Sequence, residues 1–248
     1  MILAVNTAEE SLQLVISQGG EILEAFEETC AGRMNEVMAP AAAAMLARRS
    51  EALTALACVR GPGSFTGVRL GLAFCTGLAL AKGVPMAGLD YLPVLAAGVY
   101  APDAAEIHVL THSRANKVYH QGFMPAPRTD GLPGLPAPLG PPLDLDLPLA
   151  VEIIRERAAC SKVAVIGSGL RRNPGAFAKI PGAMLLEIEN PTLEALVSAA
   201  LTAVYDGPPV DALYLRGSDA EENLAMIAKG RGLSEEEAKE RMAEALKS

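Results

Sequence analysis

The first fifty residues alternate short apolar segments with turn-forming residues, a pattern typical of strands. Three such segments, Ile2–Val5, Ser11–Ser17 and Ile22–Thr29, are separated by the turn-like sequences NTAEE and QGGE. Gaps this short favour hairpins, so we expect three antiparallel neighbouring strands. A stripe rich in Met and Ala then recurs at helical spacing and predicts a helix over Asn35–Arg49.

The next segment is dominated by a helix that has no polar face. A buried strand over 54–60 runs into the glycine turn Gly61–Ser64, and an apolar helix is predicted over Phe65–Ala81, followed by a strand over Val84–Leu89. Arg69 is the only charged residue within this helix. A helix that is apolar all round should be covered on every side. Either the domain wraps it completely, or another chain covers one face.

The order of these elements predicts a particular kind of sheet. A meander of three strands that passes into right-handed parallel crossovers is the plan of a ribonuclease H-like sheet, whereas a Rossmann sheet would begin with βαβ. The second half repeats this order more weakly, with a hairpin (Ile107–Thr111, Lys117–Met124), a helix (Leu149–Ala159) and a strand (Val163–Ile166) that ends in a glycine turn. We therefore predict an α/β, two-lobed actin-like fold, each lobe a mixed sheet flanked by helices.

The domain boundaries follow from changes in composition. The turn-like sequence APDAAE near 101–106 predicts an N-terminal lobe over 1–103, a C-terminal lobe over 104–217 and a helical segment over 218–248. Residues 125–148 are so rich in proline that we predict a semi-rigid surface loop, neither sheet core nor helix.

Three more helices are predicted towards the C-terminus. One covers Thr192–Tyr205 after a proline, and two begin at the capping-box patterns of Ser218 and Ser234.

Composition narrows the class of protein. Half of the 248 residues are apolar and a fifth are charged, which indicates a globular chain. The net charge of −8 and pI near 5.0 argue against this chain alone binding nucleic acid through phosphates. Four cysteines without CxxC spacing predict buried free thiols in a reducing compartment. The chain starts with a strand rather than a signal peptide, and its longest apolar run, Leu70–Ala81, is shorter than the ~20 residues that cross a bilayer. We expect a soluble, cytoplasmic protein without membrane contact.

The glycine turn invites a phosphate-binding interpretation, which its residues do not fit. A Walker A loop needs GxxxxGK[ST], but Val68 follows Gly67 here. A dinucleotide fingerprint needs GxGxxG, and the third glycine comes one place late, although Asp90 ends the following strand where a ribose-binding acid could stand. We predict a tight turn with close packing, and no nucleotide-binding residues.

The three histidines form no predicted metal site. His108 and His112 have the HxxxH spacing that chelates zinc on a helix, but IHVLTH is predicted as a strand. At ~3.3 Å per residue the two imidazoles would stand about 13 Å apart, too far to share one ion. We expect these two residues and His120 to be partly exposed sheet residues.

Catalytic groups are missing from the positions where this fold class would carry them. Asn6 follows the first strand, where nucleases with such a sheet place a metal-binding acid, and an uncharged amide binds Mg²⁺ poorly. The sequence NTAEES offers no glycine for a phosphate hairpin, and Ser64 has no identifiable His or Asp partner. We predict an enzyme-like fold with no catalytic residues.

Two blocks of the sequence resemble the bacterial TsaB (YeaZ) family. These are MILAVNTAEESLQLVI and GPGSFTGVRLGLAFCTGLALAKGVPMAGLDYL, the second with the family's GPGSFTGxRxG block; SRANKVYHQGF and VDALYLRGSDAEEN are weaker matches. The resemblance implies a dimerisation subunit that supports TsaD, a transferase that makes tRNA threonylcarbamoyladenosine next to the anticodon, with the ATPase TsaE completing the complex. It also implies that the isolated chain can homodimerise, that tRNA is reached only through the complex, and that ATP and metal reside on the partner subunits.

The resemblance further implies an interface on the first two helices. Its predicted residues are Met34, Val37, Met38, Ala41, Met45, Phe65, Val68, Arg69, Leu72, Ala73 and Thr76. Leu72→Glu and Met38→Glu would test it, provided that these side chains are exposed. The chain departs from the family at Asn6, where Asp is usual, and at Met34-Asn35, where "HS" is common. The alternative functions are a stand-alone actin-like ATPase or a glycopeptidase-type metallopeptidase. The sequence leaves open the choice between homodimer and heterodimer and the roles of Arg69, the proline-rich segment and the C-terminal tail.

Overall fold

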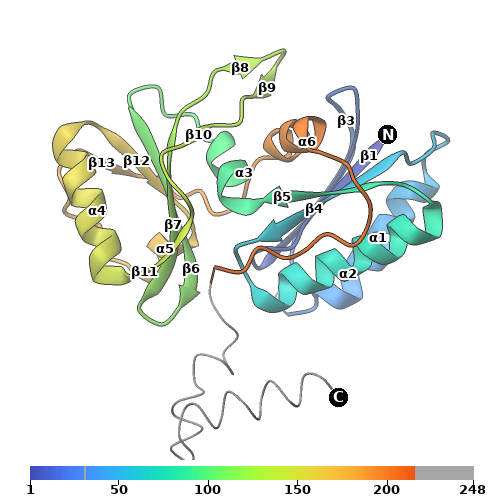
Figure 1. Cartoon of the computed structure of the whole chain (residues 1–248), viewed down its shortest axis with the longest axis horizontal. Helices are drawn as coiled ribbons and strands as arrows, with labels where there is room; N and C mark the ends of the chain where they lie inside the picture. Colours follow the sequence, from blue (N-terminus) through green and yellow to red (C-terminus); the bar gives the residue numbers. More distant parts are fainter. Residues whose placement is uncertain (31, 216–248) are drawn as a thin grey trace, which may run out of the picture. The chain divides into compact units, whose positions relative to one another are not determined.

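A computed structural model of the chain describes residues 1–30 and 32–215, and Met1–Leu213 form one compact unit, to which the description below refers. This unit contains two mixed sheets flanked by helices, as Figure 1 shows. The predicted α/β, two-lobed actin-like fold class is therefore confirmed. The helices predicted from Ser218 and Ser234, and the segment 218–248 as a whole, lie outside the described residues.

The first sheet has the predicted meander followed by parallel crossovers. Its strand order is β3-β2-β1-β4-β5, with β1–β2 and β2–β3 antiparallel and β1–β4 and β4–β5 parallel. The strands are β1 Ile2–Asn6, β2 Ser11–Gln18, β3 Glu21–Thr29, β4 Ala55–Gly61 and β5 Met86–Asp90.

Helices cover both faces of the first sheet. Helices α1 (Met34–Ala47) and α2 (Phe65–Lys82) pack on one face, and α6 (Leu193–Thr202) packs on the other against β1, β2 and β3 (Figure 1). Strand β2 is buried along almost its whole length because it lies between α1 and α6. Helix α6 comes from the predicted C-terminal lobe by sequence, yet it completes the core of the first sheet.

The second sheet repeats the hairpin and crossover of the first. Its order is β10-β7-β6-β12-β13, with β6–β7 antiparallel and β6–β12 and β12–β13 parallel. The elements are β6 Glu106–Arg114, β7 Lys117–Met124, α4 Leu147–Cys160, β12 Val163–Ile166, α5 Ser168–Arg172 and β13 Ala183–Leu185. A core that includes Leu110, Ile154, Val165 and Phe177 joins α4 to this sheet.

The proline-rich segment contains more regular structure than predicted. A two-stranded hairpin forms from β8 (Arg128–Thr129) and β9 (Leu132–Pro133), while β10 (Ala137–Pro138) and β11 (Leu143–Asp146) pair with the edge of β7. The prediction of a surface loop over all of 125–148 is therefore wrong. Prolines are tolerated here because an edge strand needs hydrogen-bond donors on only one side.

Helix α3 (Tyr91–Ala97) links the two sheets. It packs against β4 and β5 of the first sheet and against β6 and β7 of the second, and all its residues but one are buried. The hydroxyl of Tyr91 donates to the Glu189 carbonyl oxygen at 2.8 Å. Through its contacts with strands of both sheets, α3 holds the two sheets together.

The cysteines match the prediction of free thiols only in part. All four are free, and Cys30, Cys58 and Cys75 are buried. Cys160, at the end of α4, is exposed, because the helix turns that position away from the sheet.

Candidate functional site

The glycine turn before α2 uses its backbone amides within the chain. The Ser64 amide donates to the Ala8 carbonyl oxygen at 2.7 Å. The Ser64 side chain caps α2 by accepting a hydrogen bond from the Gly67 amide at 3.2 Å. A phosphate loop offers such amides to the ligand instead. The contacts agree with a packing turn.

Two glycines of α2 allow the helix to touch the turn between β1 and β2. A Cβ atom placed on Gly67 would lie 2.1 Å from the Thr7 carbonyl oxygen, and one on Gly71 would lie 2.3 Å from the Thr7 hydroxyl. No side chain fits at such distances. The spacing of Gly67 and Gly71 within this helix therefore allows its inner face to pack closely against the first sheet.

The outer face of α2 is apolar and exposed. Phe65 is 42% exposed and Leu80 is 68% exposed, and Ala73 and Gly77 between them are exposed as well. The buried residues of the helix are Gly67, Val68, Gly71, Leu72, Cys75 and Ala79. Of the two outcomes expected for an all-apolar helix, complete wrapping within Met1–Leu213 is excluded. The outer face is available to another chain.

The predicted interface residues divide into two groups. Val37, Ala41, Phe65, Arg69, Ala73 and Thr76 are exposed or half-exposed, whereas Met34, Met38, Met45, Val68 and Leu72 are buried in the chain itself. Met38→Glu and Leu72→Glu do not qualify as surface variants, because these side chains are only 2% and 8% exposed. The interface itself stays a prediction, and the six accessible residues are the ones that can form it.

Arg69 contributes a polar group to the otherwise apolar face. Its guanidinium carbon lies 3.8 Å from the centre of the Phe65 ring, one turn earlier in α2. Such a cation–π contact holds the long side chain along the helix. The contact with Phe65 gives Arg69, whose role the sequence left open, a structural role on the surface of α2.

Helix α2 also needs comparison with membrane helices. Among the described residues it is the one helix long and apolar enough to cross a bilayer by length and composition. The apolar run Leu70–Ala81, which is shorter than the whole helix, did not predict this. One such helix is weak support for a membrane span, and the contacts of Gly67 and Gly71 with Thr7 make α2 part of the first sheet's cover.

Asn6 is engaged in the position where a metal-binding acid would stand. It is buried; its side-chain amide donates to Gln13 at 2.8 Å, and its side-chain oxygen accepts from the Ala8 amide at 3.0 Å. Both polar atoms of the side chain thus serve the β1–β2 hairpin. Within residues 1–30 and 32–215 no three or more His, Cys, Asp or Glu side chains converge to hold a metal ion.

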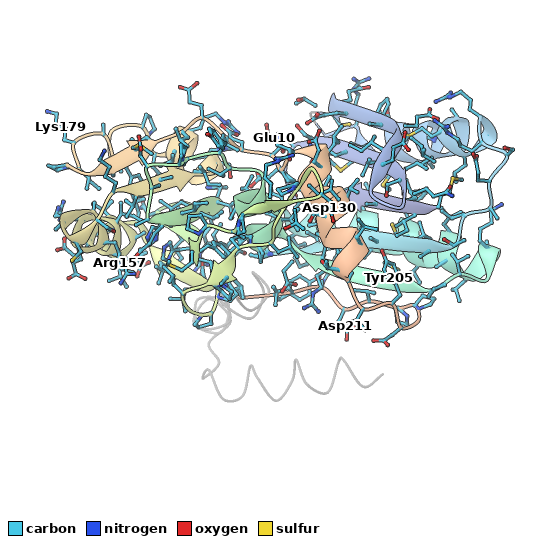
Figure 2. The ribbon with its side chains drawn as sticks, turned by 90° about the horizontal axis from the view of Figure 1, so that it is seen from above. Glu10, Asp130, Arg157, Lys179, Tyr205 and Asp211 are labelled. Atoms are coloured by element: carbon cyan, nitrogen blue, oxygen red, sulfur yellow. The ribbon has the colours of Figure 1, made fainter. Side chains whose placement is uncertain are left out.

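A pocket of about 450 Å³ lies beside this hairpin, between elements of both sheets. Glu10, one of its lining residues, is labelled in Figure 2. Its lining residues are Glu9, Glu10, Ser11, Thr29, Arg171, Glu187, Glu189 and Asn190. Most of the ionisable groups are acidic, which disfavours the phosphates of a nucleotide.

Glu9 is the residue in this pocket that sequence reasoning missed. The Ser168 hydroxyl donates to the Glu9 carboxyl at 2.7 Å, across 159 residues of sequence. Burial raises the pKa of Glu9 to about 7, and the neighbouring Glu189 adds to the effect while Ser168 opposes it. The available signals were weak ones: two glutamates in the turn after the first strand, and a Gly-Ser-Gly turn after β12.

The histidines differ from the prediction of partly exposed sheet residues. His108 and His120 are buried, and only His112 is half-exposed. The rings of the buried pair stack, with 3.0 Å between His108 Nδ1 and His120 Nε2. The other nitrogen of His108 lies 2.9 Å from Glu106, which also binds Arg157 of α4. Arg157 is labelled in Figure 2. Helix α4 packs against β7, and β11 pairs with β7 directly beside His120.

Comparison with known proteins finds similarity to proteins of tRNA threonylcarbamoyladenosine biosynthesis. Residues 27–124 match the family model described as TsaD, tRNA N6-adenosine threonylcarbamoyltransferase. Two curated relatives are named tRNA threonylcarbamoyladenosine biosynthesis protein TsaB. The one from Escherichia coli K12 is 34% identical over 122 residues, which is 48% of this chain and 52% of that protein. The one from Haemophilus influenzae is 30% identical over 126 residues, 48% of this chain and 51% of that protein. The chain thus spans about half the length of the curated relatives it matches.

Solved structures share the fold over a longer range. A Pseudomonas aeruginosa protein described as similar to the peptidase YeaZ superposes with a TM-score of 0.69 at 24% identity, covering 87% of this chain and 99% of that one. YeaZ from Pseudomonas aeruginosa gives a TM-score of 0.67 at 22% identity, covering 86% and 99%. At this level of identity, the likeness concerns the fold.

Proposed function

We propose that the chain is a member of the TsaB (YeaZ) family and a non-catalytic subunit in tRNA threonylcarbamoyladenosine biosynthesis. In this role it supports a TsaD-like transferase that modifies the position next to the anticodon. The observation that carries the proposal is the exposed apolar face of α2. An apolar surface of this kind is a common mark of a protein–protein interface.

The geometry around the β1–β2 hairpin supports a non-catalytic role. Asn6 is committed to hydrogen bonds within the hairpin, and the Ser64 and Gly67 amides are bonded inside the chain. ATP and metal are then expected on the TsaD-like and TsaE-like partners. The net charge of −8 agrees with tRNA being reached only through the complex. A cytoplasmic location follows from a tRNA substrate.

The proposed partner surface consists of the outer face of α2 and the accessible side of α1. A TsaD-like partner is expected to present a related pair of helices, because the match to the TsaD family model spans both α1 and α2 of this chain. Two similar helix pairs can pack around a pseudo-two-fold axis. In the absence of the partner, a second copy of this chain could use the same face. Homodimer and heterodimer then exclude each other.

Ala73→Glu tests this surface directly. Ala73 is exposed near the middle of α2, so a carboxylate there should leave the fold intact. In the complex, however, that carboxylate would be buried with no positive charge to pair with it. We expect affinity for a TsaD-type partner to fall about 30-fold or more, equivalent to ~2 kcal/mol. Isothermal titration with the purified partner measures the affinity, and an in vitro tRNA modification assay measures the consequence.

Ala159→Glu is the matched control. Ala159 is an exposed helical alanine of α4, on the second sheet, and this variant should bind and support modification like the parent. Undiminished assembly and modification by Ala73→Glu would refute the surface. The stand-alone ATPase or metallopeptidase would gain support from micromolar affinity for ATP·Mg²⁺, or from stoichiometric zinc in the purified chain.

A further inference from the structure

The Glu9 carboxyl lies where the two sheets meet. Glu9 belongs to the turn between β1 and β2, and Ser168 is the first residue of α5 in the second half. The Ser168 oxygen, which donates its proton to Glu9, accepts the His112 amide of β6 at 2.9 Å. A chain of two hydrogen bonds therefore runs from the first sheet's turn into the second sheet.

The charges around Glu9 come from each element packed against it. They are Glu10 on its own turn, Tyr91 on α3, Arg171 and Arg172 on α5, and Glu187 and Glu189 on the segment after β13. Among the described contacts, the arginines are bonded to other acids. Arg171 binds both carboxylate oxygens of Glu189 at 2.7 and 2.9 Å, and Arg172 binds Glu10 at 2.8 Å.

Ionisation of Glu9 is therefore poorly compensated. The carboxyl is half-buried, its hydrogen-bond donor is a neutral hydroxyl, and Glu10 and Glu189 stand nearby. A charged carboxylate in such a place needs water, and the adjoining pocket is where water can enter. A neutral carboxyl has no such need and keeps its contact with Ser168.

We propose that Glu9 is a proton-dependent latch between the two sheets, closed on α5 when its carboxyl is neutral and loosened when it is ionised. Because burial raises the pKa of Glu9 to about 7, this change falls within the range of pH found in cells. The proposal is independent of the proposed function, since it involves neither the outer face of α2 nor a partner.

Hydrogen–deuterium exchange of the whole chain at pH 6 and pH 8 tests the latch. The readout is protection of peptides that cover the β1–β2 turn and α5. Glu9→Gln keeps the shape of the side chain but cannot ionise, and measuring it at the same pH removes the effect of pH on intrinsic exchange. We expect the protection of the parent, divided by that of Glu9→Gln at the same pH, to fall about tenfold between pH 6 and pH 8.

Glu10→Gln is the matched control, since Glu10 is the exposed neighbour and its loss should add no pH dependence of protection to these peptides. A ratio of parent protection to Glu9→Gln protection that is the same at both pH values would overturn the latch. If Glu9→Gln fails to fold, an NMR titration of carboxyl-labelled parent protein replaces it. A pKa below about 5.5 for Glu9 would then overturn the proposal, because the carboxyl would be ionised at both pH values.

Discussion

Gly67→Ala is expected to destabilise the chain by about 3 kcal/mol or more, whereas Gly77→Ala should be neutral or stabilising. Both glycines lie in α2. A Cβ atom on Gly67 would meet the Thr7 carbonyl oxygen at 2.1 Å, and a backbone atom cannot rotate away. The helix and the β1–β2 turn would have to separate. At Gly77 nothing lies within 4 Å, so only the better helix propensity of alanine, about 1 kcal/mol, remains.

Urea denaturation followed by circular dichroism measures both variants. Gly71→Ala provides an intermediate case, because its Cβ would meet the Thr7 hydroxyl, the end of a side chain, at 2.3 Å. The expected order of stability is Gly77→Ala, parent, Gly71→Ala and Gly67→Ala. Equal midpoints for the Gly67 and Gly77 variants would show that α2 does not dock on the hairpin as described.

The sequence was sufficient for the first sheet because its signals are local. Short gaps enforce hairpins, and the glycine turn separates β4 from α2, so element types and order were predicted correctly. The prediction for the proline-rich segment was wrong for a physical reason. Pro138 lies on β10, which pairs with β7 and forms the edge of the second sheet, and an edge strand tolerates a residue without an amide hydrogen.

The partner surface was predicted only in outline. Apolar residue type identified α1 and α2, but it cannot distinguish an apolar face that packs on a sheet from one that is uncovered. Met38 and Met45 lie in the core, whereas Leu80, absent from the predicted interface, is the most exposed large apolar side chain of α2. The direction of each side chain depends on how the helix docks, and the contacts of Gly67 and Gly71 set that direction.

The contact between Glu9 and Ser168 could not be predicted from the sequence. It joins residues 159 positions apart, and its geometry depends on how the two sheets meet. The histidine pair is a similar case within one sheet. Correct strand alternation placed His108 and His112 on one face, but the register with β7 and the cover from α4 decide that His108 is buried against His120.

The buried histidine pair should make the second sheet sensitive to acid. Burial, with His108 as a smaller cause, lowers the pKa of His120 to about 4 from an ordinary value of 6.5. At His120, the unfolded chain therefore binds more protons than the native chain between about pH 6.5 and 4. Stability from the neutral His120 is complete above pH 6.5 and is lost as the pH falls to 4, by about 3 kcal/mol in total.

His120→Gln is expected to remove this dependence. The contacts indicate where the protons lie. Glu106 is ionised, because its bonds to Arg157 and His108 outweigh the effect of burial and lower its pKa. His108 therefore donates a hydrogen bond to Glu106 and accepts one from His120. Glu9 has the opposite sign, because its raised pKa means that stability falls as the pH rises from 4.5 to 7. The two slopes partly cancel in the parent. Urea denaturation of His120→Gln between pH 4.5 and 6.5 should therefore show stability falling with rising pH. His112→Gln alters a half-exposed histidine whose pKa is lowered less, by partial burial and by Arg172 and Arg171, so it should change the profile less than His120→Gln does. Identical profiles for all three proteins would contradict a neutral, buried His120.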